Sequence, residues 1–219
     1  MFQILNLLIG NPLLGLAFIG AIILAIGLHE AAHAYSAYWL GDNTPKFQGR
    51  LTLNPINHLD PIGTLLIIIV GFGWGRAVEF NPYNLKNAKR DIALVAFAGP
   101  AMNILLAIIC SLIVNSGVLP IVLGSDLYLQ SLPIIVLFAQ LNITLAVFNL
   151  IPVEPLDGFK VLAGLLPNHL ANQWYQTRQY GVYVLIVILI TGAVEKIVFP
   201  ITTFLFNLIF FLRFYIEST

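Results

Sequence analysis

The sequence predicts an all-α polytopic membrane protein, a bundle of about four to six transmembrane helices with a short re-entrant β-hairpin or loop. Its composition supports this prediction, because 59% of the residues are hydrophobic and only 9% are charged. A soluble domain carries roughly 25% charged residues, and the mean hydropathy here is +0.91. The chain also contains several apolar segments long enough to cross a bilayer. We expect residues 1–219 to form a single membrane domain, with its core at 13–165 and C-terminal membrane helices within 180–214.

The apolar segments follow one another along the chain. Residues 13–39 form the first, and its polar residues lie near its end. Residues 92–116 and 133–151 form two more, and each reaches about 30 Å as a helix, the thickness of the hydrocarbon core. The region 180–214 is interrupted by glycine, charged residues and proline. It is therefore expected to hold either one span plus an interfacial helix, or two spans.

Residues 61–75 form an apolar segment that is too short to span, since a helix of this length covers about 22 Å. The segment is rich in β-branched residues from Ile67 to Val70 and ends in the glycine-rich run 71–75. These features favour a re-entrant β-hairpin or bent loop sheltered by protein. Such an edge strand could pair with an extended substrate; the alternative is that the segment only fills space in the bundle.

His29-Glu30-Ala31-Ala32-His33 is an H-E-x-x-H motif inside the first apolar segment. Histidines at positions i and i+4 lie on one helical face, where both rings can bind one tetrahedral Zn²⁺. The glutamate between them can take a proton from a zinc-activated water and deliver it to a leaving amine. A charged residue inside a membrane helix costs at least about 2.5–3.5 kcal/mol, so it is functional by default. The motif predicts a zinc metalloprotease with Glu30 as general base.

A zinc site of this kind usually has a third protein ligand, and Asp157 is the best candidate. It follows the segment 133–151, on a stretch that Pro152 and Pro155 hold out of a helix and in which Gly158 permits a turn. The alternative is that this aspartate caps the helix that follows.

Three other residues are weaker candidates for the third ligand. Glu154 precedes the turn and is the rival carboxylate. His58 is expected to form hydrogen bonds within a loop, and His169 lies in a polar stretch, where an interfacial position is expected.

The motifs together resemble the site-2 protease family of intramembrane metalloproteases. Three stretches carry the resemblance: the H-E-x-x-H motif, Gly99-Pro-Ala-Met-Asn103, and Asn149 through the Pro-Leu-Asp157-Gly158 turn. The chain looks like the compact bacterial-type members that lack a PDZ or CBS domain. Glu154 departs from the family, since many members carry an apolar residue or proline there.

The resemblance implies a function and a set of site residues. It implies that His29, His33 and Asp157 hold Zn²⁺ and that Asn149 and Asn103 help to hold the substrate backbone. It also implies that the substrates are membrane proteins cut within or next to their transmembrane segments, in regulated intramembrane proteolysis. The expected location is a prokaryotic cell membrane.

The proposed ligands constrain the topology. For Asp157 to join the histidines, the ends of segments 13–39 and 133–151 must reach the same membrane side, so 61–75 cannot be a full span. Loop 117–131 contains no Lys or Arg. The basic residues expected on the side of the site are Lys46, Arg50, Arg76, Lys86, Lys89, Arg90, Lys160 and Arg178. By the positive-inside rule the active site faces the cytoplasm.

Two other functions deserve comparison with proteolysis. A membrane transporter for zinc or protons would also place His, Glu and Asp in the bilayer, but segments 92–116 and 133–151 contain no Asp, Glu, Lys, Arg or His. An inactive binding scaffold would not require Glu30. The net charge of zero and the lack of a basic block argue against nucleic acid as a partner. The single cysteine, Cys110, excludes a disulfide framework, and the sequence does not define an oligomeric state.

Overall fold

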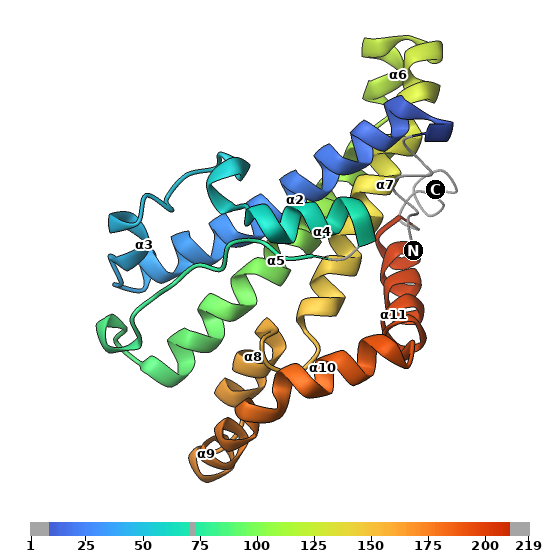
Figure 1. Cartoon of the computed structure of the whole chain (residues 1–219). Helices are drawn as coiled ribbons and strands as arrows, with labels where there is room; N and C mark the ends of the chain where they lie inside the picture. The colour runs from blue at the N-terminus through green and yellow to red at the C-terminus, as the bar shows by residue number, and fades with distance from the viewer. Residues whose placement is uncertain (1–8, 71–72, 211–219) are drawn as a thin grey trace.

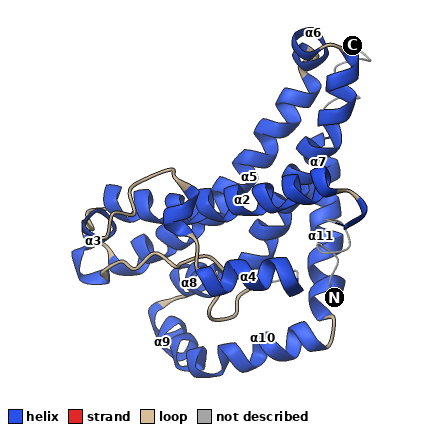
Figure 2. Cartoon of the chain, turned by 45° about the horizontal axis from the view of Figure 1, so that its top comes forward, coloured by secondary structure: helices blue, strands red, loops and turns tan. Residues whose placement is uncertain are grey.

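The computed structural model describes residues 9–70 and 73–210. The regular elements in these ranges are helices joined by loops, and the prediction of an all-α polytopic protein is confirmed (Figures 1 and 2). Within the described residues, four helices are long and apolar enough to cross a membrane. They are α2 (Pro12–Trp39), α5 (Ala88–Asn115), α7 (Ser125–Asn149) and α11 (Ala193–Phe210).

Helices α2, α5 and α7 pack against one another and form the centre of the bundle. Their shared interfaces are built from small side chains, and Ala25, Ala107 and Ala146 are fully buried there. Small residues allow membrane helices to approach closely, which replaces the hydrophobic driving force that lipid removes. Asparagines begin two of these helices: the Asn11 side chain accepts a hydrogen bond from Leu14 N, and the Asn87 side chain accepts one from Arg90 N.

Helix α7 begins earlier than the sequence predicts. Its first residue is Ser125 rather than Pro133, and the proline lies inside the helix. The short helix α6 (Val118–Leu123) precedes it, separated by Gly124, whose φ is +76°. The expected loop 117–131 is therefore mostly helical, although it still contains no basic residue.

The C-terminal region consists of one span and a shorter helix. Helix α10 (Gly181–Ile190) has 10 residues, and α11 follows after a bend at Gly192 with φ +68°. Of the two arrangements that the sequence left open, the described residues agree with one span plus a short helix. Residues 211–214 of the predicted segment 180–214 lie outside the described residues.

The predicted β-hairpin at 61–75 is wrong over residues 61–70, which form the α-helix α4 (Pro61–Val70). The helix begins favourably, because Asp60 Oδ1 accepts a hydrogen bond from Gly63 N at 2.7 Å and Pro61 stands in the first turn. Ile67 of α4 packs against Ile22 and Ile26 of α2. Within the described residues the only β pairing is an isolated antiparallel bridge between Leu59 and Gly75. Burial of Ile67 against α2, together with the favourable start of the helix, outweighs the β preference of the branched residues. Positions 71–72 of the predicted turn lie outside the described residues.

Helix α4 is still too short to span, so the predicted re-entrant character of the segment agrees with the structure. After it, residues 73–80 run as an extended segment beside α2. Three short helices lie in the rest of the long connection between α2 and α5: α3 (Thr44–Phe47), η1 (Pro55–His58) and η2 (Pro82–Asn84).

Asp42 ties this connection to the end of α2. It is fully buried, and its carboxylate accepts hydrogen bonds from Asn84 Nδ2 and Asn81 N, each at 2.7 Å, and from Thr44. Burial alone would raise the pKa of this carboxyl, but the hydrogen bonds from Asn84 and Thr44 outweigh it and lower the pKa below its ordinary value.

Candidate metal centre

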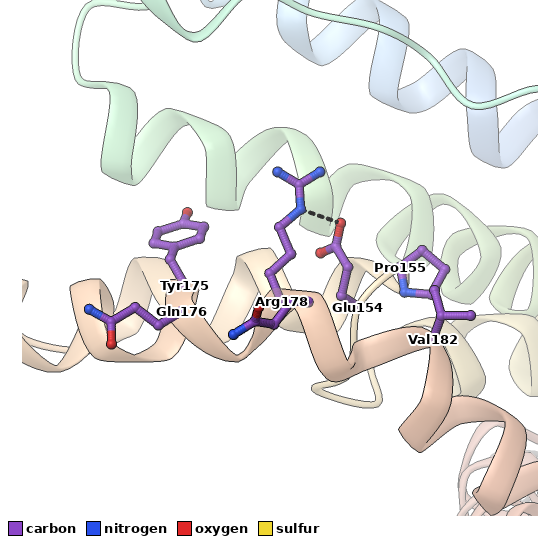
Figure 3. A pocket seen from close by; sticks show the side chains of 7 residues that line it. Glu154, Pro155, Tyr175, Gln176, Arg178 and Val182 are labelled. Carbon is purple, nitrogen blue, oxygen red and sulfur yellow. Dashed lines mark hydrogen bonds and ion pairs between the residues drawn. The ribbon is translucent and has the colours of Figure 1, made fainter.

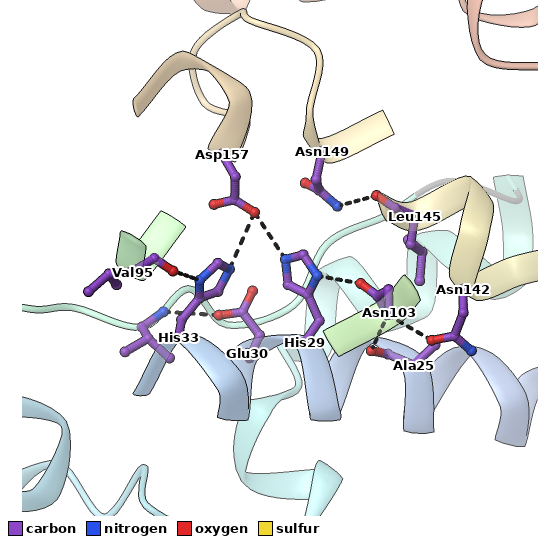
Figure 4. Close-up of polar contacts among 11 residues, drawn as sticks. Ala25, His29, Glu30, His33, Val95, Asn103, Asn142, Leu145, Asn149 and Asp157 are labelled. Carbon is purple, nitrogen blue, oxygen red and sulfur yellow. Dashed lines mark hydrogen bonds and ion pairs between the residues drawn. The ribbon is translucent and has the colours of Figure 1, made fainter. Parts of the chain in front are cut away.

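Three side chains that can bind a metal meet between α2 and α8 (Asp157–Leu165). His29 and His33 are one turn apart on α2, and Asp157 is the first residue of α8 (Figure 4). Asp157 Oδ2 lies 3.1 Å from His29 Nε2 and 3.3 Å from His33 Nε2. The structure thus brings together the three residues that the sequence predicts as ligands, and their ligand atoms all lie within 4.8 Å of one another.

These separations match those of ligands around one zinc ion. Ligand atoms that lie about 2.0–2.1 Å from a tetrahedral ion are about 3.3 Å from each other. The hydrogen bonds made by the two imidazoles also leave both Nε2 atoms free to bind a metal. His33 Nδ1 lies 2.7 Å from the carbonyl oxygen of Val95, which can only accept, so Nδ1 carries the proton and Nε2 has a free lone pair. His29 Nδ1 likewise lies 2.5 Å from Asn103 Oδ1. The residues therefore fit a zinc ion.

Gly99 of α5 makes room for the two imidazoles. A Cβ atom at this position would come within 2.6 Å of His29 Nε2 and still closer to His33 Nε2. This contact explains the glycine in the Gly99-Pro100 pair, because α5 can pass the metal-binding atoms only where it has no side chain.

The bend before α8 carries Asp157 to the histidines. The backbone turns through residues 150–156, and Gly158 packs so closely on the carbonyl groups of Leu150 and Ile151 that a Cβ could not fit. Both Nε2 atoms face the same carboxylate oxygen, Asp157 Oδ2, so a metal bound between them would take the ionised form of this carboxyl group. Asp157 lies in the first turn of α8. The N-cap position of this helix is occupied by Leu156, so Asp157 is not the capping residue.

Glu30 lies beside the cluster at the wall of a cavity. Its Oε2 accepts a hydrogen bond from Val78 N at 3.1 Å, which fixes the carboxylate against the extended segment 73–80. The cavity has a volume of about 760 Å³ and its walls are mainly apolar. The walls come from α2, α4, α5, α7, α8, α10 and α11 and from the extended segment. The cluster and Glu30 therefore share one apolar cavity with room for several residues of another chain.

The two asparagines that the resemblance assigns to substrate binding are placed differently. Asn149 lines the cavity, and its Nδ2 donates to Leu145 O. Asn103 is fully buried behind His29 and does not line the cavity, so its placement gives no support to substrate contact. Asn142, which the sequence analysis missed, is also fully buried and bonds to Asn103. The missed signal was an amide side chain in the middle of an otherwise apolar span.

The remaining candidates lie away from the cluster. Glu154 forms an ion pair with Arg178, at 3.1 Å between its Oε1 and the guanidinium Nε, in the separate pocket shown in Figure 3. His58 is fully buried, and its Nε2 lies 2.9 Å from Thr52 O, as expected of a residue that forms hydrogen bonds within a loop. Burial and the charge of Arg50 lower the pKa of His58. His169 is exposed in α9 (Asn168–Gln176).

Comparisons with known proteins identify the family. The sequence model described as Peptidase family M50 matches residues 115–193. The chain is 39% identical over 187 residues to a protein of Bacillus subtilis (strain 168) named "Putative zinc metalloprotease YwhC", and the match covers 82% of each chain. The chain belongs to peptidase family M50. It is also 29% identical over 205 residues to Rip2 of Mycolicibacterium smegmatis (strain ATCC 700084 / mc(2)155), across 88% of this chain and 76% of Rip2. No solved structure gives a significant match to the chain.

Membership of the M50 family, which is the site-2 protease family, confirms the resemblance found in the sequence. The protein is a zinc metalloendopeptidase, and its long apolar helices make it an integral membrane protein. The names of both relatives refer to a zinc metalloprotease and give no support to a transporter.

Proposed function

We propose that this M50 peptidase hydrolyses peptide bonds within or beside the transmembrane segments of other membrane proteins, with His29, His33 and Asp157 as its zinc ligands and Glu30 as its general base. The observation that carries the proposal is the meeting of these four side chains at one apolar cavity. Candidate membrane-spanning helices form much of the cavity wall, a location that suits a membrane-embedded substrate better than a soluble one.

When bound, zinc supplies the Lewis acidity that polarises a peptide carbonyl and makes water acidic. The chain's own residues do the rest. The Glu30 carboxylate takes a proton from the attacking water, the water oxygen bonds to the carbonyl carbon, and the C–N bond breaks. The same carboxylate then delivers the proton to the departing amine. The hydrogen bond from Val78 N holds Glu30 in position for both transfers.

The cavity supports an extended, apolar substrate. A substrate helix hides its carbonyl groups in its own hydrogen bonds, so it must unwind before a base can act on it. The extended residues 73–80 line the cavity next to Glu30, and we propose that their backbone, rather than residues 65–70, pairs with the unwound chain. Asn149 lies at the wall of the same cavity, where its amide can contact the substrate backbone.

A proline at Ala77 tests the pairing, because proline cannot donate a backbone hydrogen bond. We expect Ala77→Pro to lose most of its cleavage and to keep its zinc, whereas Ala77→Ser should behave as the wild type. Unchanged cleavage by Ala77→Pro would remove the pairing from the proposal.

We also propose that the site faces the cytoplasm of a prokaryotic cell and acts in regulated intramembrane proteolysis, on single-pass proteins first trimmed by another protease. The positive-inside rule supports this orientation, since loop 117–131 has no Lys or Arg. Single cysteines test it in a chain that carries Cys110→Ala. Lys46→Cys should react with a membrane-impermeant reagent only from the cytoplasmic side, and Asp126→Cys only from the other side. The reverse pattern would invert the topology.

The principal experiment is cleavage of a model transmembrane substrate by purified protein in detergent, with zinc content measured in parallel. We expect the wild type to cleave, and Glu30→Gln to keep its zinc while losing cleavage by a factor of at least about 10². Glu195→Gln, an exposed carboxylate of α11 that is not among the residues lining the cavity, is the matched control and should cleave normally. Cleavage by Glu30→Gln at the wild-type rate would rule out the proposed base.

A further inference from the structure

A chain of buried amide groups runs from α7 through α5 to the candidate metal centre. Asn142 of α7 donates from Nδ2 to Phe138 O at 2.8 Å. Asn103 of α5 donates from Nδ2 to Asn142 Oδ1, also at 2.8 Å, and its Oδ1 faces His29 Nδ1 at 2.5 Å. Both asparagines have no exposed surface, and Figure 4 shows them on the opposite side of His29 from His33.

Each hydrogen bond in this chain fixes the direction of the next. The Phe138 carbonyl can only accept, so Asn142 must present its NH₂ group there and its oxygen to Asn103. Asn103 must then present its NH₂ group to Asn142 and its oxygen to His29. The carbonyl oxygen of Ala25 accepts from the same NH₂ group at 3.2 Å and favours the same orientation. Consequently His29 carries its proton on Nδ1 and directs the free lone pair of Nε2 toward Asp157 and the metal position.

The two histidines differ in what orients them. His33 Nδ1 faces the backbone carbonyl of Val95, which the helix α5 itself holds in place. His29 instead faces a side-chain amide, whose oxygen and nitrogen can exchange places by rotation of the terminal bond. An exchanged amide would point NH₂ at Nδ1 and favour the tautomer that lacks a lone pair on Nε2. Of the two histidines, only His29 therefore depends on a second residue that fixes the orientation of its hydrogen-bond partner, the Asn103 amide.

We propose that Asn142 is a positioning residue of the metal site: it locks the Asn103 amide so that His29 presents an unprotonated Nε2 to zinc. This inference rests on the proposed role of His29 as a ligand. It assigns a role in metal binding to a residue of α7 that is not a ligand and is not among the residues that line the cavity. Burial of an amide in an apolar span is costly. Fixing the orientation of the Asn103 amide would explain why α7 buries Asn142.

Zinc affinity is the measurement that tests the proposal, taken by competition with a chromophoric chelator on the detergent-purified full chain. Loss of a group that orients a ligand typically weakens metal binding by about 10–100-fold. We expect about a ten-fold loss for Asn142→Ala and at least as large a loss for Asn103→Ala. The double variant should bind zinc no more weakly than Asn103→Ala alone, because Asn142 acts through Asn103.

Ser111→Ala provides the matched control for a purely structural effect. Ser111 is also buried, and its hydroxyl donates to Ile209 O at 2.7 Å, which joins α5 to α11 far from the cluster. This variant should lower the melting temperature and leave zinc affinity unchanged. If Asn142→Ala behaves like Ser111→Ala, or if its loss of affinity adds fully to that of Asn103→Ala, the positioning role is wrong. A wild type that binds no zinc would instead overturn the proposed function, so the two failures can be told apart.

Discussion

Gly99→Ala should damage the metal centre directly, although it adds a single methyl group. An added Cβ would lie 2.6 Å from His29 Nε2, whereas ordinary van der Waals contact begins at 3.4 Å. The imidazole or α5 must therefore move by about 0.8 Å. Metal–ligand distances tolerate deviations of about 0.2 Å, so the expected displacement is several times larger than the site can absorb.

The consequences of this displacement differ for activity and stability. A misplacement of about 1 Å in an active site can cost about 10²-fold in rate, so we expect cleavage to fall by about that factor. Overpacking of a well-packed interior costs about 1–3 kcal/mol, so the fold should survive with a lower melting temperature. Zinc content after dialysis should fall well below one ion per chain.

Gly20→Ala is the matched control, because this residue also lies in a spanning helix but has nothing within 4 Å of an added Cβ. Alanine is favoured over glycine in a helix by about 1 kcal/mol, so Gly20→Ala should bind zinc and cleave as the wild type does. If Gly99→Ala keeps zinc and cleavage at wild-type levels, the close approach of α5 to the histidines is not a requirement of the site.

Three further predictions concern the ligands, the base and the loop histidine. Asp157→Ala should weaken zinc binding by at least about ten-fold in the chelator assay, whereas Glu154→Ala, on the same bend, should keep it; the opposite result would make Glu154 the ligand. Val78→Pro removes the N–H that holds Glu30 and should slow cleavage by about ten-fold at unchanged zinc content, while Val78→Ala should not. His58 has a lowered pKa, so the unfolded chain takes up a proton near pH 6.5 that the folded chain resists. The contribution of neutral His58 to stability is therefore present above pH 6.5 and is lost as the pH falls below that value. The melting temperature of the wild type should drop more between pH 7.5 and 5.5 than that of His58→Gln. Parallel curves for the two proteins would contradict this.

The sequence predicted the parts of the site that depend on local spacing. His29 and His33 are brought together by one turn of helix, so their proximity follows from the i, i+4 relation. The approach of Asp157 required an argument about topology, and it succeeded because only a segment 61–75 that does not span allows the two ends to meet. Neither inference needed side-chain packing.

The failures have equally physical causes. The β-branched residues of α4 have only a weak intrinsic preference for strands, and burial of Ile67 against α2 decided their conformation. The placement of Asn103 behind His29 could not be predicted, because the position of a residue in a motif does not reveal which way its amide points. Asn142 could not be predicted from charge, because it carries an uncharged amide, although amides buried between membrane helices form hydrogen bonds across them.

The candidate ligands come from parts of the chain that are far apart, since His29 and Asp157 are separated by 128 positions. A zinc ion bound to both would act as a covalent-like cross-link that closes this long loop. Closing a long loop lowers the entropy of the unfolded chain, and ions that bind only the folded state stabilise it. Zinc supply would then govern how long the protease persists in the cell as well as whether it cuts.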